Sequence, residues 1–147
     1  MNKLLLAAWA LLATAGAATA QTENDTKMKP IAMTRADFLQ KVADYEKNPD
    51  TWHYLGDKPA VIDFYASWCG PCRALAPVLD ELAAKYGEEI YVYKIDVDSE
   101  QELAAVFGIR SIPTLLFIPT EGNPRIVTGM QPKNVLEQQI REILPAR

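Results

Sequence analysis

The two cysteines of this chain are separated by two residues, in the segment Cys69-Gly70-Pro71-Cys72. This segment follows a strand-length apolar run, Ala60 to Ala66, and precedes residues 75–86, whose leucines and valine recur at helical spacing. A cysteine pair at such a strand-to-helix junction lies in the first helical turn, where an i, i+3 spacing brings both side chains onto one face. A disulfide between Cys69 and Cys72 is therefore geometrically easy to form.

The position of the pair also predicts different roles for its two thiols. The unpaired N–H groups and the dipole of a helix N-terminus favour an anion, so we expect Cys69 to supply the attacking thiolate. Cys72 lies one turn inside the helix, and we expect it to be more buried and to resolve the mixed disulfide. Pro71 fits the first helical turn, where its missing N–H costs little. The alternative is a structural disulfide, which would stabilise the fold only weakly because its loop is so small.

Composition argues against several other functions, including nucleic-acid binding and metal or haem binding by the cysteines. The formal charge of −4 and the absence of a basic run argue against nucleic acid as a partner. Two cysteines and one histidine, His53, are too few soft ligands for a tetrahedral zinc site. Haem attachment needs a histidine after the second cysteine, where this chain has Arg73. We therefore expect no metal and no cofactor.

The first twenty residues are predicted to be a signal peptide. Lys3 is followed by an uncharged stretch from Leu4 to Ala20, which ends in the small-x-small sequence Ala18-Thr19-Ala20. An uncleaved membrane anchor is the alternative, but this stretch is short for a span and rich in alanine. We expect cleavage before Gln21 and a periplasmic or secreted product. The chain then divides into a signal peptide at 1–20, a flexible segment at 21–33 and one folded domain at 34–147.

Strands and helices alternate along this domain. Thr34 and Asp37 predict a helix start, and Asn48-Pro49-Asp50 predicts its end. A second strand is expected at 90–97, and Ser99 with Glu102 is expected to cap a short helix. A hairpin at 114–128 and a helix at 132–144 complete the pattern. The alternation predicts an α/β fold with parallel inner strands.

The sequence around the cysteines resembles the thioredoxin family. The resemblance is carried by residues 61–73 (Val-Ile-Asp-Phe-Tyr-Ala-Ser-Trp-Cys-Gly-Pro-Cys-Arg), Pro77, Gly108-Ile109, Ile112-Pro113-Thr114 and Gly129. It extends over residues 58–144 and implies a thioredoxin fold, with a central mixed sheet and a C-terminal antiparallel hairpin flanked by helices. Residues 45–57 are longer than the usual connection, Tyr65 replaces a common tryptophan, and Met130 replaces a smaller residue. We expect these differences to affect partner preference and the rim of the substrate groove, not the chemistry.

Asp63 interrupts an apolar strand, where an unpaired carboxylate is costly and burial raises its pKa. The resemblance implies that Asp63 deprotonates Cys72, the alternative being a structural aspartate. The resemblance also matches Lys94 to a lysine that lies beside this acid in the family. The alternative is that Lys94 is a strand lysine that faces solvent.

The resemblance also implies a cis peptide before Pro113, packed against the cysteine pair. Backbone groups of Ile112 and Thr114 could then pair with an extended substrate segment. Trp68 is interpreted either as a docking platform beside the nucleophile or as ordinary packing. The predicted site consists of the catalytic Cys69, Cys72 and Asp63, the tuning residues Gly70, Pro71 and Lys94, and the substrate-binding residues Trp68, Ile112, Pro113, Thr114, Gly129 and Met130.

The leading functional hypothesis is an exported thiol-disulfide oxidoreductase, active as a monomer, that reduces protein disulfides. The Gly-Pro dipeptide of its motif favours the reducing direction. A reductant in an oxidising compartment needs an electron donor, which we expect to be a membrane-bound reductase or another thiol reductant. A disulfide oxidase or isomerase on the same fold and a non-catalytic binding module are the alternatives.

Overall fold

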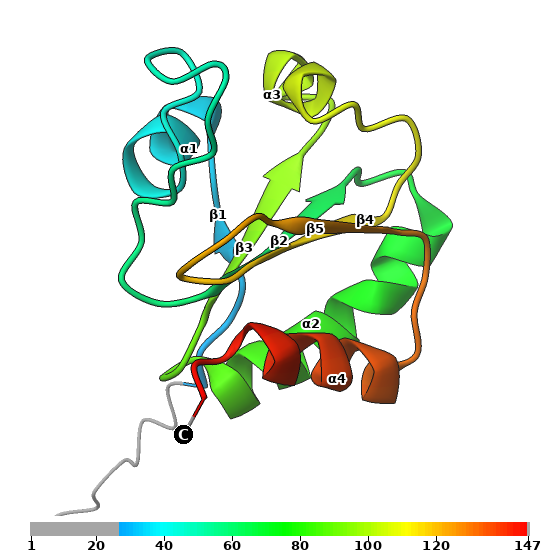
Figure 1. The fold of residues 1–147 in the computed structure, drawn as a ribbon. Coiled ribbons are helices and arrows are strands. Elements are labelled where there is room, and N and C mark those ends of the chain that lie inside the picture. Colours follow the sequence, from blue (N-terminus) through cyan, green and yellow to red (C-terminus); the bar gives the residue numbers. More distant parts are fainter. Residues whose placement is uncertain (1–26, 147) are drawn as a thin grey trace, which may run out of the picture.

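The computed structural model describes residues 27–146, which form a five-stranded sheet with helices on both faces (Figure 1). The strands are β1 Ile31–Ala32, β2 Ala60–Tyr65, β3 Tyr91–Asp96, β4 Thr114–Ile118 and β5 Arg125–Thr128. The helices are α1 Arg35–Lys41, α2 Gly70–Tyr86, α3 Gln101–Val106 and α4 Lys133–Ile143. The strand order is β1-β3-β2-β4-β5, in which β1, β3 and β2 are parallel and the β4–β5 hairpin is antiparallel. The predicted α/β class and mixed sheet are confirmed.

The alternation of side chains along the inner strands decides which residues face the active-site helix. Val61 belongs to the core that α2 and α4 cover, whereas Ile62 and Phe64 belong to the core that α1 and α3 cover. Successive strand residues point to opposite faces, so Asp63 shares the α2 face with Val61. Lys94 lies in register with Asp63 on the neighbouring strand and points to the same face.

The first helix ends earlier than predicted. It stops at Lys41 with Val42 as its C-cap, whereas the sequence predicted that it would continue to Asn48-Pro49-Asp50. The carbonyl of Val42 accepts a hydrogen bond from the N–H of Leu55 at 2.9 Å, so it does not bond to the residue four positions on. A contact with the following segment therefore ends the helix, which local sequence cannot show.

Two other local predictions differ from the structure. The sequence predicts a flexible segment through residue 33, but Ile31–Ala32 forms β1 and the N–H of Met33 bonds to the Lys94 carbonyl at 2.9 Å. A two-residue strand is too short to display a period. Ser99 does not cap α3: the N-cap is Glu100, whose carboxylate accepts a hydrogen bond from the Arg35 N–H at 3.1 Å.

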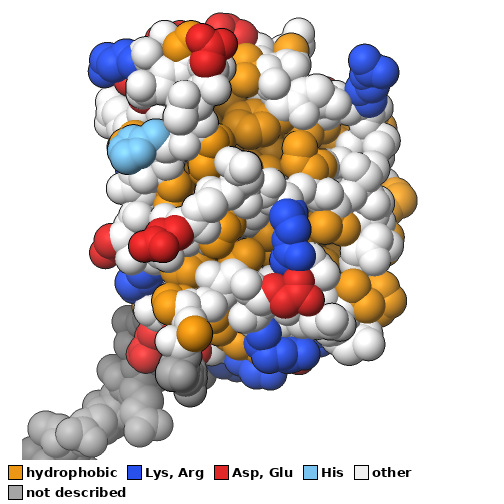
Figure 2. Space-filling view, in the orientation of Figure 1, with side chains coloured by type: hydrophobic (Ala, Val, Ile, Leu, Met, Phe, Trp, Pro, Cys, Tyr) orange, Lys and Arg blue, Asp and Glu red, His pale blue; other side chains and the backbone are white. Residues whose placement is uncertain are grey.

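β5 is an edge strand, and its Ile126 side chain is half-exposed. Hydrophobic side chains gather across the middle of the face on which Figure 1 places β4 and β5 (Figure 2). The remaining edge is occupied by the short β1.

The start of the described chain and its C-terminal end lie together at one end of the molecule, whereas the β2–α2 junction lies at the other (Figure 1). The predicted signal peptide falls outside the described residues. Within residues 27–146, no helix is long and apolar enough to cross a membrane.

Candidate active site

The cysteine pair lies at the N-terminus of α2, as its spacing predicted. Cys69 is the N-cap residue, and its Sγ accepts a hydrogen bond from the Cys72 N–H at 3.2 Å. Pro71 occupies the first turn, where it removes an N–H that no helical carbonyl would accept. The helix dipole and the free N–H groups at this end stabilise negative charge on the Cys69 sulfur when the bond is reduced.

Cys69 and Cys72 form a disulfide with a Cα–Cα distance of 5.3 Å. The expectation that Cys72 is the more buried of the two is wrong for this disulfide form, because both residues are 4% exposed. Ile112, from a later part of the chain, packs against Cys69, and its carbonyl oxygen lies 3.8 Å from the Cys69 Sγ. Cys72 instead borders a hollow that it shares with Asp63. The two sulfurs therefore differ in their neighbours and not in their exposure.

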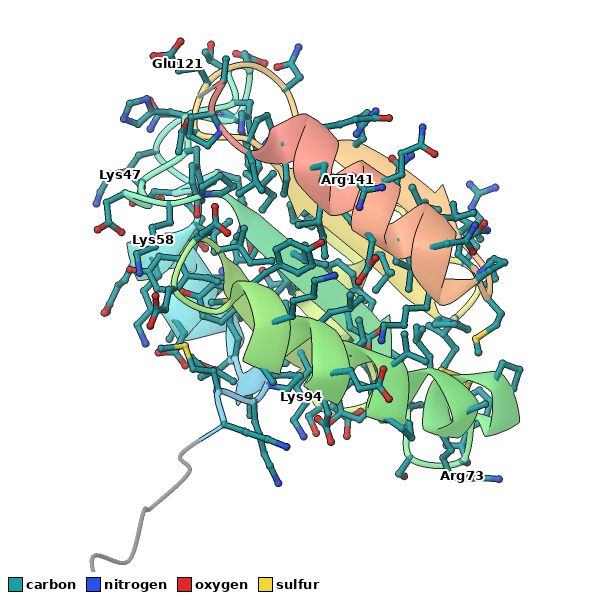
Figure 3. The ribbon with its side chains drawn as sticks, turned by 90° about the horizontal axis from the view of Figure 1, so that it is seen from below. Lys47, Lys58, Arg73, Lys94, Glu121 and Arg141 are labelled. Carbon is teal, nitrogen blue, oxygen red and sulfur yellow. A yellow bond between two sulfur atoms is a disulfide. The ribbon has the colours of Figure 1, made fainter. Side chains whose placement is uncertain are left out.

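Asp63 is buried on the α2 face of the sheet, 5% exposed, and its Oδ1 has no hydrogen-bond partner in the described part of the chain. Burial raises the pKa of the Asp63 carboxyl to about 7, and the positive charge of Lys94 opposes that rise. Lys94 lies alongside α2 (Figure 3), and its Nζ is 5.8 Å from the centre of the Tyr65 ring. Such a carboxyl can accept and release a proton near neutral pH.

Trp68 projects into solvent beside the disulfide and is 66% exposed. Its indole N–H donates a hydrogen bond to Oδ2 of Asp98 at 2.8 Å, which fixes the orientation of the ring. Asp98 was not among the predicted site residues. Because the carboxyl ends of parallel strands share one edge of a sheet, the residues after β2 and after β3 meet there, and this topology could have indicated Asp98.

The peptide bond between Ile112 and Pro113 is cis, and it lies next to the disulfide. The Pro113 carbonyl accepts a hydrogen bond from the Gly129 N–H at 2.8 Å. Gly129 has φ of 86°, in the left-handed region that favours glycine, where the chain leaves β5. Met130 follows in the chain, and its side chain is 45% exposed.

Thr114 is placed differently from the prediction. It lies inside the sheet, in register with Phe64 on one side and Thr128 on the other. Its hydroxyl donates a hydrogen bond to the Ser111 carbonyl at 2.7 Å, and the residue is 2% exposed. The structure therefore leaves Ile112, and not Thr114, with backbone groups outside the sheet.

The structure brings the remaining predicted residues together. Trp68, Ile112 and Pro113 lie around the Cys69–Cys72 disulfide. Gly70 is exposed beside it, and Asp63 and Lys94 line the hollow behind Cys72. Among residues 27–146, no three His, Cys, Asp or Glu side chains converge as metal ligands. The arrangement supports nucleophilic attack by a sulfur at a helix N-terminus, with a proton acceptor behind the second sulfur.

Comparisons with known proteins agree on one family. The family model described as thioredoxin matches residues 29–142. A thioredoxin from Borreliella burgdorferi is 45% identical over 112 residues, which cover 76% of this chain and 95% of the relative. The M-type chloroplastic thioredoxin of Pisum sativum is 39% identical over 100 residues, covering 66% of this chain and 58% of that protein.

Two solved thioredoxin structures share this fold. A mutant thioredoxin from Halobacterium salinarum superimposes with a TM-score of 0.65 at 29% identity, covering 81% of this chain and 94% of that one. A thioredoxin from Malassezia sympodialis gives a TM-score of 0.64 at 29% identity, with coverages of 79% and 91%.

Proposed function

This chain belongs to the thioredoxin family and is a thiol-disulfide oxidoreductase, and on that premise we propose that it is exported and reduces disulfides in other proteins. The observation that carries the proposal is the Cys69–Cys72 disulfide at the N-terminus of α2, with the buried Asp63 behind Cys72. The motif places Gly70 and Pro71 between the cysteines, which favours the reducing end of the family's range.

The reaction proceeds in two exchange steps. The Cys69 thiolate attacks a substrate disulfide, forms a mixed disulfide and releases one substrate thiolate, which takes a proton from solvent. The Cys72 thiol gives its proton to the Asp63 carboxylate and attacks the Cys69 sulfur, so that the Cys69–Cys72 bond forms and the second substrate thiolate leaves. The substrate gains two electrons and the dithiol loses them.

Substrate recognition is assigned to the surface around the disulfide. Trp68 and Met130 provide exposed apolar area on which a folded or unfolded substrate can rest. The backbone groups of Ile112 lie outside the sheet and can pair with an extended segment that flanks the substrate cysteine. Pairing through backbone groups tolerates many sequences, so we expect a broad range of protein substrates.

Export is proposed from the sequence before the domain. The uncharged stretch from Leu4 to Ala20 ends in a small-x-small site, and the family match begins only at residue 29. N-terminal sequencing of the protein recovered from producing cells tests this proposal, and Gln21 is the expected first residue. Recovery of Met1 in the membrane fraction would contradict cleavage. An exported reductant needs a continuing supply of electrons, for which we propose a membrane-bound or other thiol reductant.

The reduction potential separates a reductase from an oxidase. Thioredoxin has a reduction potential of about −270 mV, whereas the periplasmic oxidant on this fold has a potential of about −120 mV. We expect a redox titration against dithiothreitol, followed by the fluorescence of Trp68, to give a value near that of thioredoxin. A value near that of the oxidant would make the protein an oxidase or isomerase.

A trapping experiment tests the two-step scheme. The Cys72→Ser variant lacks the resolving thiol and is expected to accumulate mixed disulfides through Cys69, which non-reducing electrophoresis detects. The Cys69→Ser variant is the control, because it lacks the attacking thiol and is expected to trap nothing. Equal trapping by the two variants would reverse or remove the assigned roles.

A further inference from the structure

A small hollow lies beside Asp63, bounded by β2, β3, α2 and the residue before β1. Its volume is about 90 Å³, which is more than the space that a single water molecule needs. The lining residues that matter here are Pro30, Asp63, Cys72, Ala76, Asp80 and Lys94. The hollow thus joins the predicted proton acceptor, Asp63, to Ala76 and Asp80, which have no role in the two exchange steps.

The α2 side of the hollow is formed by one stripe of the helix. Cys72, Ala76 and Asp80 recur every four residues and therefore lie on the same helical face. At 1.5 Å per residue, this stripe runs about 12 Å along the helix axis. Cys72 is buried, whereas Ala76 and Asp80 are exposed. The hollow is therefore closed at the cysteine and open to solvent at the other end of the stripe.

The closed end holds an unpartnered acceptor. Oδ1 of Asp63 is buried and bonds to no group in residues 27–146. Buried polar atoms in proteins are paired with protein groups or with water, and this hollow has room for water. Ordered water in the hollow would satisfy the carboxyl and join it to the open end.

The groups that face Asp63 come from every element around it. Lys94 faces it from β3, and Tyr65 comes from its own strand. From α2, Cys72 and Asp80 line the same hollow. Pro30, before β1, closes the remaining side without a charge. Asp80 is the exposed carboxylate at the mouth.

We propose that this hollow is the path by which Asp63 returns its proton to solvent, with Ala76 keeping the path open and the Asp80 carboxylate receiving the proton at its mouth. The inference rests on the proposed role of Asp63 as the acceptor of the Cys72 proton. After the Cys69–Cys72 bond has formed, Asp63 carries that proton as a neutral acid. The proton passes through water to Asp80 and then to the bulk, and Asp63 becomes a carboxylate again for the next cycle.

Closing the mouth tests the path. In Ala76→Leu a larger side chain covers the opening without changing any charge. We expect insulin reduction at pH 7 to become about fivefold slower, and the midpoint of the pH–rate profile to move upward because Asp63 loses water. Ala84→Leu is the matched control, since Ala84 is also an exposed alanine of α2 but lies outside the hollow. Its rate and its midpoint are expected to equal those of the wild type.

Asp80→Asn tests the mouth and also covers the case in which Ala76→Leu fails to fold. We expect this surface variant to be slow in dilute buffer and to recover as imidazole is added, because imidazole can receive the proton instead. A purely structural role for Asp80 would not respond to imidazole. Wild-type rate and midpoint in a folded Ala76→Leu, or an Asp80→Asn variant that is as fast as the wild type or that imidazole does not restore, would overturn the path.

The failure of the path is distinguishable from the failure of the proposed reaction. If Asp63→Asn keeps the wild-type pH–rate profile, Asp63 is not the proton acceptor, and the premise fails. If that variant loses the pH dependence while both path variants behave as the wild type, the reaction stands and the path alone is wrong.

Discussion

Two aspartates of this molecule, Asp37 at the start of α1 and Asp63 in the centre of the sheet, have pKa values shifted in opposite directions. At Asp37, hydrogen bonds from Lys41 and from Thr34 lower the pKa from 3.8 to about 2. At Asp63, burial raises the pKa from 3.8 to about 7, against the opposing charge of Lys94. The residue type is the same, so the surroundings decide the direction.

The two surroundings differ in what they offer the charged form. Asp37 is half-exposed and closes a capping box with Thr34, in which donors surround its oxygens. Asp63 has a nearby positive charge but an oxygen without a donor in the described part of the chain. A cation nearby does not compensate a carboxylate for lost hydration when hydrogen-bond donors are missing. Asp37 therefore stabilises its helix as an anion, and Asp63 is suited to carry a proton.

Replacing the buried carboxyl is expected to have the largest effect. The pKa of Asp63 is higher in the folded chain than in the unfolded chain, so its contribution to stability is complete below pH 3.8 and is lost as pH rises to about 7. A rise in pKa from 3.8 to about 7 corresponds to a loss on the order of 4 kcal/mol in the free energy of unfolding. Asp63→Asn lacks this loss, and we expect it to be more stable than the wild type at pH 8 by about 2 kcal/mol after the cost of a buried amide.

Urea unfolding of the oxidised protein at pH 5 and at pH 8 measures this difference. The advantage of Asp63→Asn should be smaller at pH 5 than at pH 8. An advantage that does not change with pH would mean that Asp63 is already ionised at pH 5, and the contrast with Asp37 would disappear.

Breaking the capping box is expected to have a smaller effect of the opposite kind. Thr34→Ala removes the side-chain oxygen that caps α1, which costs about 1 kcal/mol in the free energy of unfolding. The pKa of Asp37 should rise towards 3.8 because a donor is lost. Since this pKa is lowered in the folded chain, the contribution of Asp37 is present above pH 3.8 and is lost as pH falls to about 2.

Thr34→Ser retains the hydroxyl and serves as the matched control, with wild-type stability expected at pH 5. Chemical-shift titration of the Asp37 carboxyl measures the pKa directly. An unchanged Asp37 pKa in Thr34→Ala would assign the lowered value to Lys41 alone.

Removing the positive charge beside the buried acid is expected to have the smallest effect. Lys94→Met keeps most of the side-chain volume but removes the ammonium group that lowers the pKa of Asp63. The pKa of Asp63 should therefore rise, and the midpoint of the pH–rate profile should rise with it. Lys94→Arg retains the charge and should leave both values near those of the wild type. A downward movement in Lys94→Met would show that the ammonium does not act on Asp63 through its charge.

The sequence was sufficient for the parts of the molecule that depend on local pattern. The apolar run before Cys69 predicted β2, and the hairpin and final helix were placed within a residue or two of their bounds. The capping box of Thr34 and Asp37 was also correctly identified. In each case, neighbouring residues alone determine the structure.

Features that depend on distant contacts were missed. The end of α1 depends on the Leu55 N–H, and β1 exists because β3 offers it a partner. The covering of Cys69 and the hydrogen bond from Trp68 to Asp98 come from segments that only the sheet topology brings to the site. Local periodicity contains no information about contacts between segments that are distant in the sequence.

The placement of the chain ends has a practical consequence for use of the protein as a reagent. The first described residues and the C-terminus leave the fold together, at the end away from the disulfide (Figure 1). An affinity tag, a carrier domain or a solid support joined at either end therefore leaves the redox face open. A column of the protein immobilised through either end would expose its cysteines to passing substrates.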